Sequence, residues 1–157
     1  MIVVRQAEPE DAKAAIQVVR YSIEELCIVD HHNDADTLAH WLANKTPEHF
    51  RNWITNSDNF CVVAEEAGSV RGVGLLHRSG EIRLFYLDPG VQRRGIGRAI
   101  HSALEKQARV WKLPKLHLDS TVNARPFYEA IGYKSAGAAK HRFDALQCYP
   151  YEKVLRY

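Results

Sequence analysis

Residues 81–110, which read EIRLFYLDPGVQRRGIGRAIHSALEKQARV, decide how the rest of the chain is interpreted. The segment starts with mostly β-branched, aromatic and leucine side chains and stops at Asp88-Pro89-Gly90, as a strand ended by turn residues does. Further on, apolar side chains recur with the 3.6-residue period of a helix that buries one face. They are Ile96, Ile100, Ala103, Leu104, Ala108 and Trp111. The segment therefore predicts a strand, a turn and a long helix.

Residues 92–98, QRRGIGR, lie where this helix begins and favour the binding of an anion. A helix N-terminus leaves backbone N–H groups without partners and carries a partial positive charge. Glycine at positions 95 and 97 removes Cβ atoms that would keep a phosphate away from those amides. Arg93, Arg94 and Arg98 can add charge-assisted hydrogen bonds worth about 1.5–3 kcal/mol each. The sequence thus predicts a cradle for a phosphate or pyrophosphate.

Other phosphate-binding loops fit these residues less well. A P-loop requires Gly-Lys-Ser/Thr after four spacer residues, and the sequence contains no such run. A dinucleotide fingerprint requires Gly or Ala three residues after Gly97, where Ile100 stands, and an acid about 20 residues further on. The loop alone also leaves open a plain strand–turn–helix junction with ordinary turn glycines.

The motif QRRGIG at residues 92–97 resembles the acyl-CoA-binding signature Q/R-x-x-G-x-G/A of the GNAT superfamily of N-acetyltransferases. A second stretch, NARPFYEAIGY at residues 123–133, resembles a later block of the same family. The resemblance covers residues 70–133 and is weak elsewhere. It implies an enzyme that transfers an acetyl group from acetyl-CoA directly to a primary amine of a small molecule or peptide in a ternary complex. A non-catalytic CoA-binding regulatory module is the alternative.

Length and composition limit the class of protein. The chain has 157 residues, of which 46% are hydrophobic and 25% charged, and this predicts one globular domain over residues 1–157. A formal net charge of +2 gives no general electrostatic case for nucleic acid. Since no signal peptide or 18-residue apolar segment occurs, we expect a cytoplasmic protein without membrane contact. Cys27, Cys61 and Cys148 stand far apart and fit neither a disulfide framework nor a metal site.

The remaining segments predict an α/β fold. Strands are expected at residues 2–6, 60–66, 70–77, 81–88 and 115–120, with two closing strands after Tyr133 and at 146–155. Helices are expected after Glu8 and at residues 38–42, 50–54 and 124–131. A polar loop at residues 30–34 is expected to follow the first of these helices. The strand at 115–120 should lie parallel to the strand at 81–88. Gly72 and Gly74 indicate that another element packs closely on their strand. We expect a single-domain GNAT-like fold, with a mixed central sheet of about six to seven strands and helices on both faces.

The resemblance also implies where acetyl-CoA binds. In the family, the two parallel strands splay apart and the pantetheine arm of the cofactor lies between them. Backbone groups of Phe85, Tyr86 and Leu87 would hold its amides. The residues that would hold the pyrophosphate are Gln92, Arg93, Arg94, Gly95, Ile96, Gly97 and Arg98. Asn123 and Tyr128 would border the cofactor on the other side.

Two residues are candidates for proton transfer. Tyr128 occupies the position of the family's general acid, and an unperturbed tyrosine pKa of about 10 suits that role; its spacing alone equally fits a core aromatic. Glu81 is the candidate general base, and the alternative is a surface ion pair with Arg83. Cys27 ends a helix, where the dipole raises the pKa of a thiol, so we predict direct transfer rather than a cysteine nucleophile.

Acceptor specificity is expected in residues 21–54 and in the C-terminal strands. The candidate substrate residues there are Glu24, Cys27, His31, Trp41 and Tyr149. The alternatives are a core position for Trp41 and an inert, exposed loop position for His31. The acids Glu24, Glu25 and Asp30 suggest a cationic acceptor. The sequence leaves the identity of the amine and the oligomeric state open, a homodimer included.

Overall fold

The structure, a computed structural model, describes residues 1–91, 95–142 and 146–157. In these ranges the strands are β1 (Ile2–Gln6), β2 (Asn59–Glu66), β3 (Ser69–His77), β4 (Ile82–Leu87), β5 (Lys115–Ser120), β6 (Lys134–Ser135), β7 (Lys140–Arg142) and β8 (Leu146–Val154). The α-helices are α1 (Ala12–Tyr21), α2 (Ile28–His31), α3 (Ala35–Leu42), α4 (Pro47–Thr55), α5 (Ile96–Val110) and α6 (Arg125–Ala130). Shorter turns are the 3₁₀ segments η1 (Pro9–Asp11) and η3 (Pro89–Val91) and the π-helical segment η2 (Ser22–Leu26). The predicted strand, turn and long helix of residues 81–110 are confirmed. No helix in the described residues has the length and apolar character needed to cross a bilayer.

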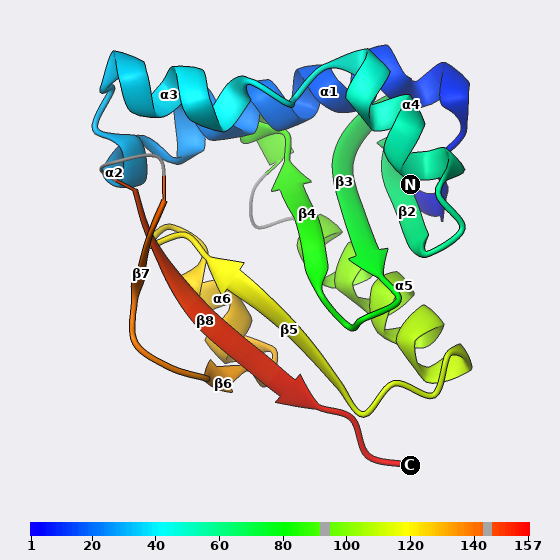
Figure 1. Cartoon of the computed structure of the whole chain (residues 1–157). Coiled ribbons are helices and arrows are strands. Elements are labelled where there is room, and N and C mark those ends of the chain that lie inside the picture. Colours follow the sequence, from blue (N-terminus) through cyan, green and yellow to red (C-terminus); the bar gives the residue numbers. More distant parts are fainter. Residues whose placement is uncertain (92–94, 143–145) are drawn as a thin grey trace.

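The predicted mixed α/β fold is confirmed, and its strands form two groups (Figure 1). One group has the order β1-β2-β3-β4, with antiparallel neighbours throughout. In the other group, β8 pairs antiparallel with β5, β6 and β7. The groups meet where Glu81 and His117 form a parallel bridge. β4 and β5 are therefore parallel neighbours, as predicted, but only at their beginnings.

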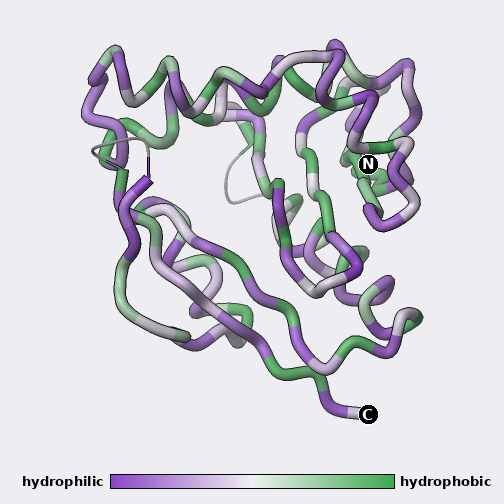
Figure 2. The backbone as a smooth tube through the Cα atoms, viewed as in Figure 1, coloured by the Kyte–Doolittle hydropathy of each residue, from purple (hydrophilic) through white to green (hydrophobic). Residues whose placement is uncertain are grey.

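Helices cover both faces of the first group because its strands alternate apolar side chains between the faces. Cys61 and Val63 of β2 pack in one buried cluster with residues of α1 and α4. Val62 and Ala64 pack in a second cluster with residues of α5. Along α1 and α3, hydrophobic and hydrophilic segments alternate turn by turn, which is typical of helices with one buried face (Figure 2).

The close packing predicted at the glycines of β3 is confirmed, and α5 is the element that packs there. A Cβ atom on Gly72 would lie 2.6 Å from Cδ1 of Ile100, and one on Gly74 would lie 2.5 Å from Cγ2 of the same side chain. Real Cβ atoms do not approach carbon this closely, so the two glycines allow α5 to lie against the sheet.

This contact gives a prediction with an internal control. Gly72→Ala should destabilise the fold by about 1–3 kcal/mol through overpacking, which lowers Tm by several degrees. Adding Ile100→Val removes Cδ1 and should recover part of the loss in a double-mutant cycle. The same valine keeps Cγ2 and should not rescue Gly74→Ala. Equal rescue of both alanine variants in thermal unfolding would contradict the packing described here.

The expected polar loop at residues 30–34 is wrong for its first two residues. Asp30 and His31 belong to α2 and are buried, with His31 0% exposed. His32 and Asn33 then take left-handed conformations, with φ of 53° and 56°, and turn the chain toward α3. The local sequence predicted a loop because these residues are polar. They are buried because they bind distant residues or backbone groups, and the local sequence does not show such partners.

Candidate active site

β4 and β5 lie close together at their beginnings and then diverge (Figure 1). At the bridge, the N–H of His117 donates to the carbonyl of Gly80 at 2.9 Å. Gly80 permits this approach, since its φ is +97° and a Cβ there would lie 2.6 Å from the carbonyl oxygen of Lys115. Beyond the bridge, within the described ranges, β4 pairs with β3 and β5 pairs with β8. The two strands therefore form a V, as the family resemblance implied.

A cavity of about 590 Å³ lies in this V and is called the first cavity here. Its walls come from η2, β4, the end of β5, the start of α5 and the segment that leads into α6. Among the residues proposed from the sequence, those that line it are Cys27, Phe85, Tyr86, Leu87, Gly95, Gly97, Arg98, Asn123 and Tyr128. Gln92, Arg93 and Arg94 lie outside the described residues. The fold thus brings residues from distant parts of the sequence to one cavity.

The anion cradle is formed where α5 begins. Gly95 is the N-cap residue, with a left-handed φ of 82° that favours glycine. A Cβ at this position would meet no atom of the described residues within 4 Å. Arg98, one turn into the helix, is exposed and lines the first cavity. The positive end of the helix dipole and this guanidinium together suit a phosphate.

The second glycine of the motif also has a packing role. Gly97 is buried, and a Cβ there would lie 3.1 Å from Cε1 of Phe127 and 3.5 Å from Cδ1 of Leu87. It therefore lets Phe127 pack on the helix, and Gly97 also lines the first cavity. Ile96 is also buried, in the cluster beneath α5, and its side chain does not line the first cavity.

Tyr128 combines burial with access to the first cavity. It is 5% exposed, and its ring packs edge-on against Phe85 and Tyr133, with centroid distances of 5.8 and 5.4 Å. Among the described residues, its hydroxyl has no hydrogen-bond partner. Burial raises the pKa of Tyr128 well above its usual range, because a phenolate would be desolvated there. The hydroxyl is therefore held in its protonated form in an apolar wall.

Trp41 lies behind the wall of the first cavity and contacts a residue that lines it. It is buried, and its indole Nε1 donates to the hydroxyl of Tyr86 at 3.4 Å. Tyr86 lines the first cavity and Trp41 does not. The core position that the sequence left open for Trp41 is thus the observed one, and its contact with the site passes through Tyr86.

Cys27 lines the first cavity as an unreactive thiol. Burial, reinforced by the negative charge of Asp30, raises the pKa of Cys27 to about 12. A thiol with such a pKa is almost fully protonated at neutral pH, whereas a nucleophilic cysteine reacts as its thiolate. The physical cause is burial, rather than the helix dipole that the sequence suggested.

The other proposed residues lie away from the first cavity. Glu24 is exposed on η2. The Nδ1 atom of His31 accepts from the N–H of Asn33 at 3.0 Å, so Nε2 carries the proton and donates to the carbonyl of Ile23 at 2.9 Å. His31 therefore supports the backbone and has no free ring nitrogen. Tyr149 stacks on the guanidinium of Arg125, which lies 4.0 Å from the ring centre.

Glu81 also lies outside the first cavity. Its Oε1 atom accepts from Nε of Arg83 at 2.7 Å, which is the surface ion pair considered as the alternative to a catalytic base. Glu81 does line another cavity, of about 360 Å³, which is called the second cavity here. The two cavities share Ile82, Arg83 and Asp119. The carboxylate of Glu81 therefore faces a space adjacent to the first cavity.

Sequence reasoning missed the role of Asp30. Its Oδ1 atom accepts from the N–H of Val122 at 2.6 Å, and its Oδ2 atom accepts from the N–H of Asn123 at 3.4 Å. Burial raises the pKa of Asp30 although these amide bonds oppose the shift. Asp30 thus joins α2 to the loop that carries Asn123 and fixes one wall of the first cavity. Because its partners lie 92 and 93 residues away, no local pattern could have revealed it.

A groove continues from the cradle along the outer side of α5. It has a volume of about 640 Å³ and shares Arg98 with the first cavity. The charged side chains that line it are Arg98, Glu105, Lys106, Arg109 and Lys153. The excess of cations extends the positive potential of the cradle over this part of the surface.

Comparison with known proteins bears on the family and the fold. The model of the family described as acetyltransferase (GNAT) domain matches residues 17–155. No curated protein matches the chain.

Several solved structures share the fold. A GCN5-related N-acetyltransferase from Rhodopseudomonas palustris, whose title also names a class-II aminotransferase, has a TM-score of 0.85 at 23% identity, over 98% of this chain and 95% of that one. The PaiA N-acetyltransferase of Thermoplasma acidophilum, solved in complex with coenzyme A, has a TM-score of 0.85 at 19% identity, over 99% of both chains. The ribosomal-protein-S18-alanine N-acetyltransferase of Escherichia coli has a TM-score of 0.69 at 15% identity, over 98% of this chain and 94% of that one. At these identities the neighbours establish the fold alone, and it agrees with the family match. The chain belongs to the GNAT family of acetyltransferases.

Proposed function

We propose that this chain is an acetyl-CoA-dependent N-acetyltransferase, which moves the acetyl group directly to a primary amine of a small molecule or peptide. One observation carries the proposal: a single cavity extends from Gly95 and Arg98, at the start of α5, to the buried side chain of Tyr128. Family membership and the coenzyme A bound to the T. acidophilum neighbour support the same cofactor. The proposal assigns the activity to one domain over residues 1–157.

Residues of this chain would hold acetyl-CoA along the V. The cofactor supplies an acetyl group that is activated as a thioester. Amides at the start of α5 and the side chain of Arg98 would bind its pyrophosphate. The cationic groove beyond Arg98 would attract its remaining phosphate. Backbone groups of Phe85, Tyr86 and Leu87, on the edge of β4 that faces away from β3, would hydrogen-bond the amides of the pantetheine arm.

Tyr128 would hold the proton that the departing sulfur takes up. Its buried hydroxyl stays protonated across the physiological pH range because burial raises its pKa. Asn123, fixed by the contact of its backbone with Asp30, would border the reacting group. These assignments need no covalent intermediate on the protein, in agreement with the protonated thiol of Cys27.

A thiol-release assay with acetyl-CoA and a panel of primary amines tests the proposal. We expect release that depends on the amine, together with a rise in Tm when acetyl-CoA is added. A Tm shift without thiol release for any amine would favour the CoA-binding regulatory module. The absence of both effects would refute the assignment of the cradle.

The role of Glu81 as the general base stays a prediction. Because Glu81 pairs with Arg83 and lies outside the first cavity, it would act through water, and we expect Glu81→Gln to lower kcat less than tenfold. Asp58→Asn is a matched control, since Asp58 forms an ion pair with Arg78 on the surface. A loss of 10²-fold or more in steady-state kinetics would instead identify Glu81 as a base in direct contact with the amine.

A further inference from the structure

The second cavity lies beside the first one and contains a buried cation. It is lined by the connection between α3 and α4, by parts of β2, β3 and β4, and by Asp119 and Arg142. Arg83 and Asp119 border both cavities, so a molecule in the second cavity can reach the V. Under the proposed function, the second cavity is the place from which an acceptor approaches.

Lys45 is the buried cation, and it is 8% exposed. Its Nζ atom donates to the side-chain oxygen of Asn44 at 2.6 Å and to the carbonyl of Trp41 at 3.3 Å. Both acceptors are neutral, and among the described residues no carboxylate forms an ion pair with Lys45. Burial and the positive charge of Arg142 lower the pKa of Lys45 to about 8. Within the described residues, the ammonium group thus lacks a direct carboxylate partner that would stabilise it.

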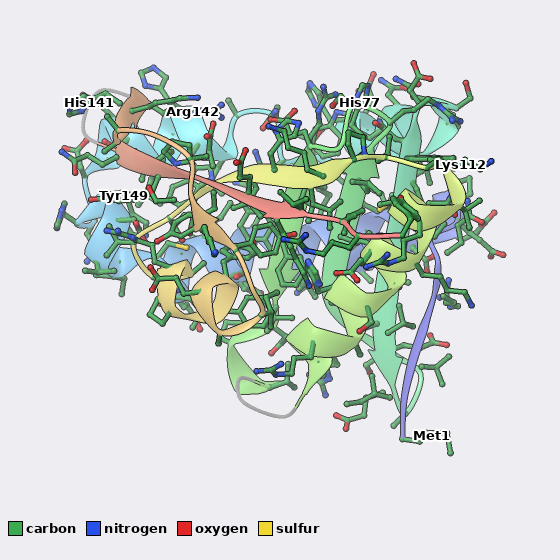
Figure 3. All side chains as sticks on the ribbon, turned by 90° about the horizontal axis from the view of Figure 1, so that it is seen from below. Met1, His77, Lys112, His141, Arg142 and Tyr149 are labelled. Carbon is green, nitrogen blue, oxygen red and sulfur yellow. The ribbon has the colours of Figure 1, made fainter. Side chains whose placement is uncertain are left out.

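The other charges on the wall of the second cavity are paired. Arg83 donates to Glu81 at 2.7 Å, and Arg142 donates to Asp119 at 3.1 Å. The remaining charge is that of Lys45, so the described lining carries one net positive charge. Arg142 forms one hydrogen bond with the part of the chain that the structure describes, and because a guanidinium has five N–H groups, further donors can serve a ligand. Figure 3 labels Arg142 on β7 and Tyr149 on β8 at the same end of the molecule.

We infer that the acceptor carries a carboxylate as well as its amine, and that Lys45 and Arg142 hold this carboxylate in the second cavity. The acceptor is then an amino acid or a short peptide with a free C-terminus. This inference rests on the proposed function, since it names the substrate class of the same site. It replaces the cationic acceptor suggested by the sequence, because Glu24 and Glu25 line neither cavity and Asp30 is bound to backbone amides.

Binding of a product-like probe tests the inference without turnover. Wild-type protein should bind N-acetylglycine at least tenfold more tightly than its uncharged match N-acetylglycinamide, as titrations followed by NMR would measure. Lys45→Met should remove most of this preference, whereas Lys13→Met makes the same charge change on the exposed face of α1 and should keep it. Lys45→Met should fold, because methionine removes a buried charge and keeps the volume. Equal affinities of wild-type protein for the two probes would overturn the inference, whatever the behaviour of the variant.

A turnover comparison separates this inference from the proposed function. Glycine and glycinamide test a free amino acid, and glycylglycine and glycylglycinamide test a peptide. Faster thiol release from glycine than from glycinamide, or from glycylglycine than from glycylglycinamide, would support the inference. The pair that shows the difference would identify the source of the carboxylate. Release at equal rates from both members of each pair would overturn the inference and leave the acetyltransferase proposal standing. Preferential binding of N-acetylglycine without release from any amine would support the carboxylate site and refute the transfer reaction.

Discussion

Tyr128→Phe is expected to lower kcat by about 10²-fold or more while the affinity for acetyl-CoA stays unchanged. The substitution removes one oxygen from the wall of the first cavity and keeps the ring that packs against Phe85 and Tyr133. If the hydroxyl supplies the proton taken up by the departing sulfur, its loss affects the chemical step alone. Steady-state kinetics and acetyl-CoA titration of both proteins measure the two quantities separately.

Tyr133→Phe is the matched control for this prediction. Tyr133 is also buried, but its hydroxyl lies 2.7 Å from Nε2 of His101 and does not line the first cavity. Burial lowers the pKa of His101 to about 4, so the ring is neutral and its tautomer decides which partner donates in this hydrogen bond. The control should lower Tm and leave kcat close to wild type. Equal kcat for Tyr128→Phe and wild type would reduce Tyr128 to a packing role.

The pH dependence supplies a second test of Tyr128. Its pKa in the folded protein lies above the value of about 10 for unperturbed tyrosine, so the acid form is fully populated below pH 10. Loss of activity through ionisation of Tyr128 should therefore begin only above that pH. An alkaline limb below pH 10 that disappears in Tyr128→Phe would contradict the burial of the hydroxyl.

Gly95→Glu is expected to abolish the stabilisation of the protein by acetyl-CoA. At a hundredfold excess over Kd, acetyl-CoA should stabilise the wild type by about 2.7 kcal/mol, which raises Tm by about 5–10 °C. The introduced carboxylate would lie at the N-terminus of α5 and compete with the phosphates for the same amides. It would also repel the anionic cofactor. Thermal unfolding with and without acetyl-CoA measures the effect.

Gly68→Glu provides a closely matched control. Gly68 has a φ of +81°, against +82° for Gly95, and a Cβ at either position would meet none of the described atoms within 4 Å. Both variants therefore bear a similar backbone strain of about 1–2 kcal/mol, but Gly68 lies in the β2–β3 turn, outside the first cavity. Its variant should have a lower Tm and keep the full shift with acetyl-CoA. A normal shift in Gly95→Glu would remove the cradle from the cofactor site.

The parts of the site that were predictable from sequence depend on short-range patterns. The β4–α5–β5 unit follows from apolar periodicity and from turn residues at 88–90, and these features act within a few residues of one another. The start of α5 is predictable for the same reason, because Gly95 and Arg98 belong to the first turn of that helix, whereas phosphate binding there stays a prediction. The V between β4 and β5 was predicted only through the resemblance to a family.

The parts that were missed depend on contacts between distant segments. Asp30 looked like a loop residue because its partners, the amides of Val122 and Asn123, follow β5. No sequence pattern singled out Lys45, and its burial follows from the tertiary packing of the segment between α3 and α4. The packing of Phe127 against Gly97 was not predicted, because nothing in the sequence near Gly97 shows it. Tertiary packing determines the environments of all three residues, and a single sequence does not reveal such packing.

The V also has a consequence for the solubility of the protein. Unpaired sheet edges attract strands of other molecules and are a common origin of aggregation. Past the bridge between Glu81 and His117, the facing edges of β4 and β5 are turned toward each other inside the molecule. Because the two edges diverge, an incoming strand could not add to both in register, and Arg83 and Asp119 place charges beside the opening. The geometry that suits a thin, flexible ligand therefore also protects two hydrogen-bonding edges from intermolecular pairing.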